Sequence, residues 1–260
     1  KKKIAVIGTG IAGLTIANLF KQNLNFEIVV YEKEKILSLE EGYGIQLAPN
    51  SISILNKIGL SNIDNKEFSN PSNLNFYSND NHKICDLNLS RFNSEEFKYT
   101  TLKRSVLIEF LKNKLFANNL RFGKEVKKIS PIKEKLLINF KDNTNDLVDF
   151  IVVSDGVFSN TKSIVENKSI QPVYNGSIAI RTILKNLSES NYDKNSISLI
   201  MLKNAHIVIY PINKKGELNV VCIIRQKLSN NIDLKALIKK EIIPQNKNLE
   251  SLFENKLEYW

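Results

Sequence analysis

Short apolar runs, separated by polar turns, follow one another along the first part of the chain. Lys3–Ile7 and Glu27–Tyr31 are rich in β-branched residues, which predicts strands buried on both faces. Between them, apolar residues at helical spacing in Ile11–Phe20 predict an amphipathic helix. A strand, a helix and a second strand within about thirty residues indicate a βαβ unit and therefore a parallel sheet.

Apolar residues three and four apart predict further helices, and alternating or continuous apolar runs predict further strands. The helices span 50–58, with Asn50 or Ser51 as N-cap, 103–115 and 234–243. The strands are Leu74–Tyr77, Lys83–Leu89, Val126–Ile129, Lys135–Phe140, Leu147–Val153, Ser177–Leu184, Ile197–Leu202, Ala205–Tyr210 and Glu217–Ile224. Short polar turns join the last four, which predicts an antiparallel sheet in the second half of the chain.

Composition narrows the class of protein. The 260 residues, 42% of them hydrophobic, suffice for one large α/β domain or two smaller ones. No apolar run approaches the roughly 20 residues that span a bilayer, and the N-terminus has no signal-peptide pattern. Cys85 and Cys222 lie far apart, which favours a reducing, cytoplasmic compartment. No cluster of histidine, cysteine and carboxylate residues has metal-ligand spacing, so we expect no metal.

The net charge of +10 has two interpretations. A basic surface can indicate a nucleic-acid partner or an anionic membrane surface. Here, however, only five of the 37 basic residues are arginines, and the lysines are scattered without interleaved aromatic residues. We therefore favour a lysine-rich composition without a nucleic-acid partner, and leave peripheral membrane contact open.

A glycine-rich loop lies between the first strand and the first helix. Residues 8–13 read G-T-G-I-A-G, the G-x-G-x-x-G pattern of dinucleotide-binding proteins. Gly8 permits the tight turn, Gly10 lets a pyrophosphate approach the backbone, and Gly13 lets the helix pack closely on the strand. The free N–H groups of the helix N-terminus favour phosphate binding. The candidate phosphate-binding residues are Gly8, Gly10, Ile11, Ala12 and Gly13.

Glu32 supports the interpretation of this loop as a dinucleotide-binding motif. It ends the second strand, 19 residues after Gly13, where an acidic side chain binds ribose hydroxyls. The alternative is a glycine-rich turn beside a surface glutamate, which the strand–loop–helix order disfavours. A carboxylate at this position indicates an adenosine ribose without a 2′-phosphate, meaning FAD or NAD.

Three later segments carry further candidate residues. Residues 42–50 read GYGIQLAPN, and the glycines, Gly44 among them, allow the backbone to lie against a planar ring. Arg104 stands at a predicted helix start. Residues 154–159, SDGVFS, directly follow a strand and place Asp155 and Gly156 in a loop.

At these residues, over nearly the whole chain, the sequence resembles the single-component FAD monooxygenases typified by para-hydroxybenzoate hydroxylase. The family carries the glycine loop with a distal glutamate, an R-x-x-L helix and an A-D-G-x-x-S-x-x-R loop. Residues 174–181 and 206–211 resemble the salicylate hydroxylase and zeaxanthin epoxidase branch. Departures are Ser154 for alanine, Lys162 for the loop arginine, Ile180 for a common tryptophan, and the absence of a G-D-A-A-H-P segment.

The resemblance implies a glutathione-reductase-like, Rossmann-type FAD-binding domain interrupted by an antiparallel substrate-binding sheet. The implied FAD domain covers 1–70 and 99–170, and the substrate sheet covers 71–98 and 171–260. Because the chain starts without methionine and stops before G-D-A-A-H-P, we expect it to lack part of the FAD domain. The implied cofactor residues are Gly8, Gly10, Ile11, Ala12, Gly13, Glu32, Lys33, Gly44, Arg104, Val126, Asp155 and Gly156. The implied substrate-pocket residues are Arg181, Tyr210 and Pro211.

The resemblance also implies a reaction. NAD(P)H reduces FAD, and O2 supplies the oxygen atom inserted into an aromatic or quinone-precursor substrate. No catalytic side chain is assigned, since His206 reads as an ordinary strand histidine. The alternatives are a flavoprotein of the same superfamily that inserts no oxygen, an NAD-dependent dehydrogenase, and a nucleotide-binding remnant without catalysis.

Overall fold

The computed structural model describes the chain except residues 38–42, 186–192, 228, 230–231, 255–256 and 260. Contacts within the chain divide it into two compact units. Unit 1 comprises Lys1–Glu41, Lys57–Leu60 and Leu107–Val173. Unit 2 comprises Gly42–Asn56, Ser61–Val106 and Tyr174–Trp260.

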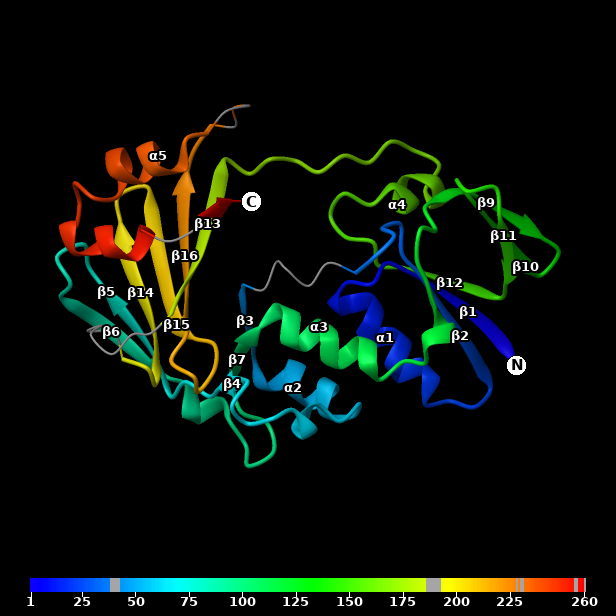
Figure 1. Ribbon diagram of the computed structural model, residues 1–260, viewed down its shortest axis with the longest axis horizontal. Helices are drawn as coiled ribbons and strands as arrows, with labels where there is room; N and C mark the ends of the chain where they lie inside the picture. Colours follow the sequence, from blue (N-terminus) through cyan, green and yellow to red (C-terminus); the bar gives the residue numbers. More distant parts are fainter. Residues whose placement is uncertain (38–42, 186–192, 228, 230–231, 255–256, 260) are drawn as a thin grey trace. The chain divides into compact units, whose positions relative to one another are not determined.

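Unit 1 contains a four-stranded sheet built on the predicted βαβ unit. Strands β1 (Lys2–Ile7) and β2 (Phe26–Tyr31) pair in parallel, with α1 (Ile11–Lys21) between them in sequence. β12 (Phe150–Val153) pairs in parallel with β1, and β8 (Leu120–Arg121) pairs in parallel with β2. The order is therefore β12-β1-β2-β8 (Figure 1). The parallel βαβ prediction is confirmed.

A three-stranded antiparallel sheet packs on this parallel sheet. It consists of β9 (Val126–Ile132), β10 (Lys135–Phe140) and β11 (Asn145–Val148). One core joins the two sheets, and its buried members are Ala5, Ile7, Val29, Tyr31, Val126, Ile138, Phe140 and Val148. Because α1 also packs on β1 and β2, both faces of these strands are covered, which explains their continuous apolar runs.

The single strand predicted at 147–153 is wrong, since β11 ends at Val148 and β12 begins at Phe150. Asp149 marks the break. Its N–H donates to the Lys3 carbonyl at 2.8 Å, and its carboxylate accepts from the Lys3 N–H at 2.7 Å. Both bonds turn the chain at Asp149, so the two halves of the apolar run enter different sheets.

Unit 2 is built on a seven-stranded mixed sheet (Figure 1). Its strands, in spatial order, are β17 (Glu258–Tyr259), β13 (Ser177–Leu184), β16 (Leu218–Arg225), β15 (Ala205–Pro211), β14 (Ser196–Leu202), β5 (Asn73–Tyr77) and β6 (Lys83–Asn88). The four strands predicted to form an antiparallel sheet do so. A purely antiparallel sheet is wrong, however, because β5 joins β14 in parallel from a distant part of the sequence.

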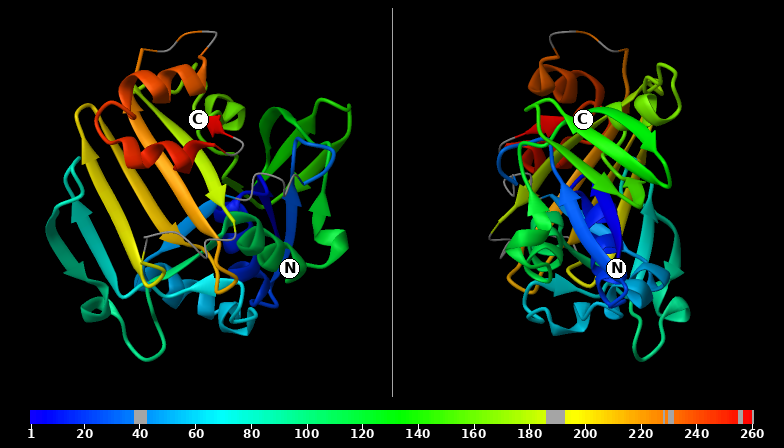
Figure 2. Two further views of the ribbon diagram at one scale, coloured as in Figure 1. Left: turned by 60° about the vertical axis from the view of Figure 1, so that its left-hand side comes forward. Right: turned by 90° about the vertical axis from the view of Figure 1, so that its right-hand side faces the viewer.

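The two faces of this sheet differ. Helix α5 (Leu234–Glu241) and the 3-10 helix η4 (Lys247–Phe253) cover one face, as the left view of Figure 2 shows. The core under them contains alternate strand residues, among them Ile180, Cys222 and Ile207. On the other face, Tyr210 belongs to a smaller apolar cluster. We call this second face the open face of the sheet.

Several shorter elements complete the fold. They are β3 (Gly44–Leu47), α2 (Pro49–Asn56), η1 (Leu60–Asn62), β4 (Phe68–Ser69), η2 (Leu89–Phe92), β7 (Thr100–Lys103), α3 (Arg104–Asn113), η3 (Ala117–Asn119) and α4 (Asn160–Val165). β3, β7 and β4 form a small antiparallel sheet. Helix α2 begins at Pro49, so neither Asn50 nor Ser51 is its N-cap, because proline already has the φ that a first helical turn needs.

The contact units and the predicted functional domains divide the chain differently. Residues 42–56, 61–70 and 99–106 group with the sheet unit, whereas the family-based prediction assigns them to the FAD domain, and residues 171–173 group with unit 1 instead of the sheet. A functional domain is defined by what it binds, so the predicted boundaries stay a prediction. None of the helices that the structure describes is long and apolar enough to cross a membrane.

A buried asparagine ties α1 to α3 within unit 1. The Asn18 side chain is 4% exposed, and its amide donates to the carbonyls of Leu14 at 2.8 Å and Leu111 at 2.9 Å. The Leu111 carbonyl lies in the last turn of α3, where backbone acceptors have no partner within the helix.

We expect Asn18→Ala to lower the free energy of unfolding by about 1–3 kcal/mol, because it leaves a buried carbonyl without its donor. Urea unfolding measures this change. The exposed Asn25, whose side chain makes no hydrogen bond within the described residues, provides the control Asn25→Ala, which should stay within about 0.5 kcal/mol of the wild type. Equal losses in both variants would contradict the assigned role.

Candidate functional site

The carboxyl ends of three parallel strands meet at one edge of the unit 1 sheet. Ile7 of β1 stands in register with Tyr31 of β2 and with Val153 of β12. The segments that follow these strands therefore emerge side by side. They are the glycine loop 8–13, Glu32 and the loop that begins at Ser154, which is the edge where open α/β sheets bind ligands.

Two glycines of the loop are required by close packing. Gly8 has φ +103°, and a Cβ there would lie 2.6 Å from the Ser154 carbonyl oxygen. A Cβ on Gly13 would lie 2.1 Å from the Gly8 carbonyl oxygen and 2.7 Å from Ser154 Oγ. The Ser154 hydroxyl itself donates to the Ile7 carbonyl at 2.8 Å, so the serine that replaces the family's alanine holds the strand end.

Gly10 is different, because no atom of the described residues lies within 4 Å of a Cβ built on it. Its φ of −69° is one that any residue adopts, so the protein alone does not require a glycine here. Gly10 is the N-cap of α1, whose first turn, beginning with Ile11 and Ala12, contains no acidic residue. The space beside Gly10 and the free N–H groups of α1 form a cradle suited to a phosphate.

Glu32 organises the same loop. Its carboxylate accepts hydrogen bonds from the Thr9 N–H at 3.0 Å, the Thr9 hydroxyl at 2.6 Å and the Glu34 N–H at 3.0 Å. Burial alone would raise the pKa of Glu32, but hydrogen bonds, those from Thr9 foremost, outweigh it and hold the pKa below its ordinary value. Glu32 is therefore ionised at neutral pH. Its three hydrogen bonds from Thr9 and Glu34 occupy three of the about four lone-pair positions of a carboxylate, which leaves about one for a further donor.

The third segment is built around Asp155. Its carboxylate accepts a hydrogen bond from the Ser159 hydroxyl, and Ser159 in turn caps α4 by accepting from the Lys162 N–H at 2.9 Å. Gly156 has φ +87°, which a residue with a side chain rarely adopts. The Lys162 side chain is exposed, and within the described residues it makes no ion pair.

Two other predicted cofactor residues, Lys33 and Val126, lie in unit 1 outside these three segments. Lys33 is exposed, and its ammonium lies 3.9 Å from the Glu34 carboxylate. Val126 is 3% exposed and belongs to the core between the two sheets, so only its backbone is free to face a ligand.

Gly44 and Arg104 lie in unit 2, and Gly42 lies outside the described residues. A Cβ on Gly44 would lie 2.7 Å from both Asn219 Cβ and Ile212 Cγ2, and the Gly44 N–H donates to Asn219 Oδ1 at 2.7 Å. Close packing inside unit 2 therefore already requires this glycine. Arg104 is the half-buried first residue of α3, and within the described chain its guanidinium makes no ion pair or hydrogen bond.

Arg181 and Tyr210 lie on the open face of the unit 2 sheet. Tyr210 is 4% exposed, and burial raises its pKa well above the ordinary range, while Arg181 and Gln46 act in the opposite direction. The Tyr99 hydroxyl donates to Gln46 Oε1 at 2.8 Å. Sequence reasoning missed Gln46 and Tyr99, because they reach Tyr210 only through the pairing of distant segments.

Pro211 and Asn219 are the neighbours of Tyr210 along its strand and across the sheet. Neighbouring strand residues point to opposite faces, so Pro211 does not share the face of Tyr210. Its carbonyl accepts a hydrogen bond from the Thr101 hydroxyl. Asn219 pairs with Tyr210 across β15 and β16, is fully buried, and its Nδ2 donates to no acceptor in the described structure.

Two family models match parts of the chain. The NAD(P)-binding Rossmann-like domain matches residues 6–40, and the squalene epoxidase model matches residues 148–259. The first match covers the glycine loop and Glu32. The second covers the β12 end, the Asp155 loop and most of the unit 2 sheet.

Curated relatives are monooxygenases. A 6-hydroxynicotinate 3-monooxygenase from Pseudomonas fluorescens is 28% identical over 190 residues, which are 70% of this chain and 47% of that protein. A 3-amino-4-hydroxybenzoate 2-monooxygenase from Streptomyces platensis is 25% identical over 221 residues, covering 83% of this chain and 54% of that protein. The chain thus spans about half the length of the curated relatives it matches.

Solved structures share the fold. Klebsiella pneumoniae HpxO, complexed with FAD and uric acid, matches with a TM-score of 0.84 at 19% identity, covering 100% of this chain and 67% of that one. A salicylate hydroxylase substrate complex matches with a TM-score of 0.79 at 15% identity, covering 99% and 67%. The strand-edge geometry, the sequence motifs and these matches agree in one respect: the chain is similar in sequence to FAD-dependent monooxygenases and shares the fold of solved aromatic hydroxylases.

Proposed function

We propose that the protein is an FAD-dependent monooxygenase that uses NAD(P)H and O2 to hydroxylate a small aromatic or quinone-precursor substrate. The observation that carries this proposal is the open cradle beside Gly10. Its neighbours Gly8 and Gly13 are required by packing, whereas Gly10 is not, so a ligand accounts for the third glycine. We infer that this ligand is the FAD pyrophosphate.

The residues around the cradle suit FAD. The N–H groups of Ile11 and Ala12 would donate to phosphate oxygens, and the remaining acceptor capacity of Glu32 would take a ribose hydroxyl. In unit 1, Lys33, the Val126 backbone, Asp155 and Gly156 complete the proposed cofactor set. Gly44 and Arg104 of unit 2 stay predicted cofactor residues on the strength of the family resemblance. When bound, FAD would supply the redox chemistry, taking a hydride from NAD(P)H and activating O2.

The open face of the unit 2 sheet would position the substrate. Because its pKa is raised, Tyr210 stays a neutral phenol and donates a hydrogen bond at neutral pH. Asn219 Nδ2 is a second donor, and a buried donor without an acceptor costs about 1–3 kcal/mol, which a substrate acceptor would offset. Arg181 adds positive charge, while Pro211 would act only through its backbone.

One observation supports a second substrate class. The squalene epoxidase match over residues 148–259 covers most of the unit 2 sheet and favours epoxidation of an apolar alkene by the same oxygen chemistry. Peripheral membrane contact would suit such a substrate and stays a prediction. The free cysteines Cys85 and Cys222 support the proposed cytoplasmic location.

Oxygen insertion is tested with 18O2. We expect the protein, supplied with FAD, NADH or NADPH and 6-hydroxynicotinate, 3-amino-4-hydroxybenzoate or salicylate, to form a product that contains one 18O atom by mass spectrometry. Squalene in the same assay tests the alkene alternative. A reduced or oxidised product without 18O would instead favour a flavoprotein that inserts no oxygen, and a colourless purified protein that oxidises substrate with NAD would favour a dehydrogenase.

Gly10→Val tests the cradle. Its Cβ would have no atom of the described residues within 4 Å and its side chain would enter the proposed phosphate space, so we expect FAD affinity to fall by about a hundredfold or more while the melting temperature changes little. Flavin titration and thermal unfolding measure the two effects. Gly13→Ala is the matched control, because its Cβ meets backbone and should lower stability itself. Wild-type FAD affinity in Gly10→Val would place the phosphates elsewhere.

Glu32→Gln tests the loop anchor. An amide presents an N–H to either Thr9 or Glu34, both of which are donors, so we expect a stability loss of about 1–3 kcal/mol near pH 7. Since the folded-state pKa of Glu32 is lowered, its contribution is present above the unfolded-state pKa and disappears as pH falls through the folded-state pKa. Urea unfolding should therefore show the difference between variant and wild type shrinking as the pH falls below the ordinary pKa of a glutamate. A pH-independent difference would contradict the role of the charge.

A further inference from the structure

We propose that a pocket at one end of the open face binds the anionic group, a carboxylate or phosphate, of an elongated apolar substrate. The proposal rests on the proposed function and names its substrate class. The pocket has a volume of about 450 Å³, and its lining includes Ser177, Asn204, His206, Ile223 and Arg225. All of them belong to unit 2.

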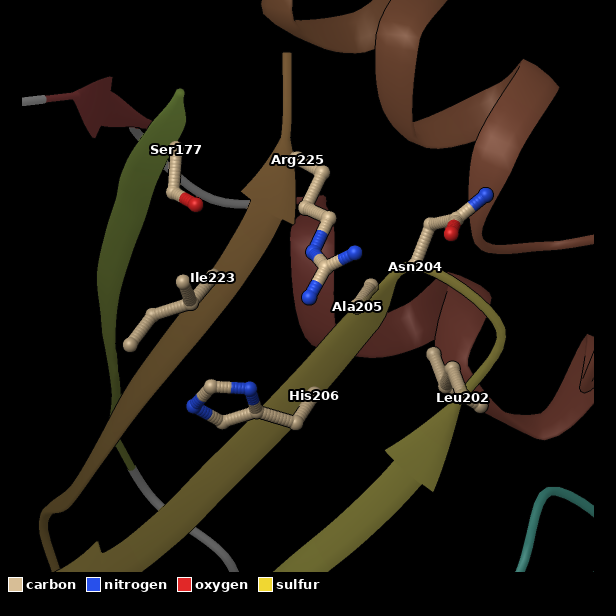
Figure 3. Close-up of a pocket in the computed structure, with 7 residues that line it drawn as sticks. All are labelled: Ser177, Leu202, Asn204, Ala205, His206, Ile223 and Arg225. Carbon is tan, nitrogen blue, oxygen red and sulfur yellow. The ribbon is translucent and has the colours of Figure 1, made fainter. Parts of the chain in front are cut away.

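Strand register brings these side chains together. Ser177 pairs with Arg225 across β13 and β16, and Ile223 pairs with His206 across β16 and β15. Figure 3 shows the Arg225 side chain extending from the end of β16 towards Ala205 and His206 of the neighbouring strand. A guanidinium and an imidazole from adjacent strands thus meet at one pocket.

The backbone under Arg225 is fixed, whereas its charge is unpaired. The Arg225 N–H donates to the Asn204 carbonyl at 3.0 Å, and the next N–H, of Gln226, donates to the Gly176 carbonyl at 2.9 Å. Within the described part of the chain, no carboxylate pairs with the Arg225 guanidinium, and the residues that line the pocket include no aspartate or glutamate. A planar guanidinium on a fixed base matches the paired oxygens of a carboxylate or phosphate.

The distance to the Tyr210 cluster sets the length of the ligand. His206 and Tyr210 are four residues apart in β15, which corresponds to about 13 Å along a strand. Arg225 stands across from Ser177, which is likewise four residues from Arg181 in β13. The open-face positions between them include Ala179, Val208 and Val221, which are apolar. A single-ring aromatic acid is too short to reach both ends, whereas a ring or alkene carrying an apolar chain and a terminal anion fits.

The test uses the full chain and three probes with the same eight-carbon chain: octanoate, octyl phosphate and 1-octanol. Calorimetric titration should show both anions binding at least about tenfold more tightly than 1-octanol, and Arg225→Gln should remove that difference. Inorganic phosphate, added as a competitor, reports whether the head group binds without the chain. The His206 ring resonances should shift when octyl phosphate is added, which places the probe at the pocket.

Arg91→Gln is the matched control, because Arg91 is an exposed arginine of the same unit without a partner in the described residues. It should bind the anions as the wild type does. Equal affinity for 1-octanol and the anions, no effect of Arg225→Gln, or the same loss in Arg91→Gln would overturn the proposal.

FAD titration of the same samples separates this proposal from the function it rests on. If Arg225→Gln binds FAD normally and loses the anions, both stand. If the wild type binds FAD but shows no preference for the anions, only the anion pocket is wrong. If anion binding depends on Arg225 while FAD does not bind, the pocket stands and the proposed function fails.

Discussion

The candidate site depends on the close approach of backbone segments at the carboxyl edge of the parallel sheet. Gly8, Gly13 and Ser154 meet there, and any side chain on either glycine would overlap the neighbouring backbone. This contact brings the N-terminus of α1 against the end of β1, so the free N–H groups of the helix point out of the sheet edge. Glu32 then fixes the loop through Thr9. The proposed phosphate site would thus follow from backbone packing and would need no basic side chain.

Local sequence patterns predicted the parts of the fold that depend on interactions between residues close in sequence. The apolar runs around residues 8–13 and the spacing of the three glycines are short-range features, so the βαβ unit and its loop could be predicted. The turn at Asp149 was missed because residues 147–153, six of which are apolar, read as one strand, while the turn depends on Lys3, far away in sequence. The parallel entry of β5 beside β14 was missed for the same reason, since no hairpin fixes its direction.

The roles of individual site residues were harder to predict than their presence. Gly44 was expected to approach a planar ring, but its packing against Asn219, 175 residues away, already requires a glycine. The group around Tyr210 has the same character, because Gln46 and Tyr99 come from β3 and the segment before β7. Such groupings depend on the register of strands that are far apart in sequence. The spacing of apolar residues in a single sequence does not reveal that register.

The two units offer different kinds of groups to a ligand, and for the proposed function this difference has a consequence for specificity. Unit 1 offers backbone N–H groups and glycines, which read phosphates and ribose, the features shared by all dinucleotides. The open face of unit 2 offers side chains on a rigid sheet, from Tyr210 at one end to Arg225 at the other. Substitutions of side chains on this face would leave the backbone hydrogen bonds of the sheet intact. The choice of substrate would therefore be free to vary while the cofactor site stays constant. If FAD supplies the oxidising chemistry, as we propose, the side chains of the open face are the ones that would select the substrate.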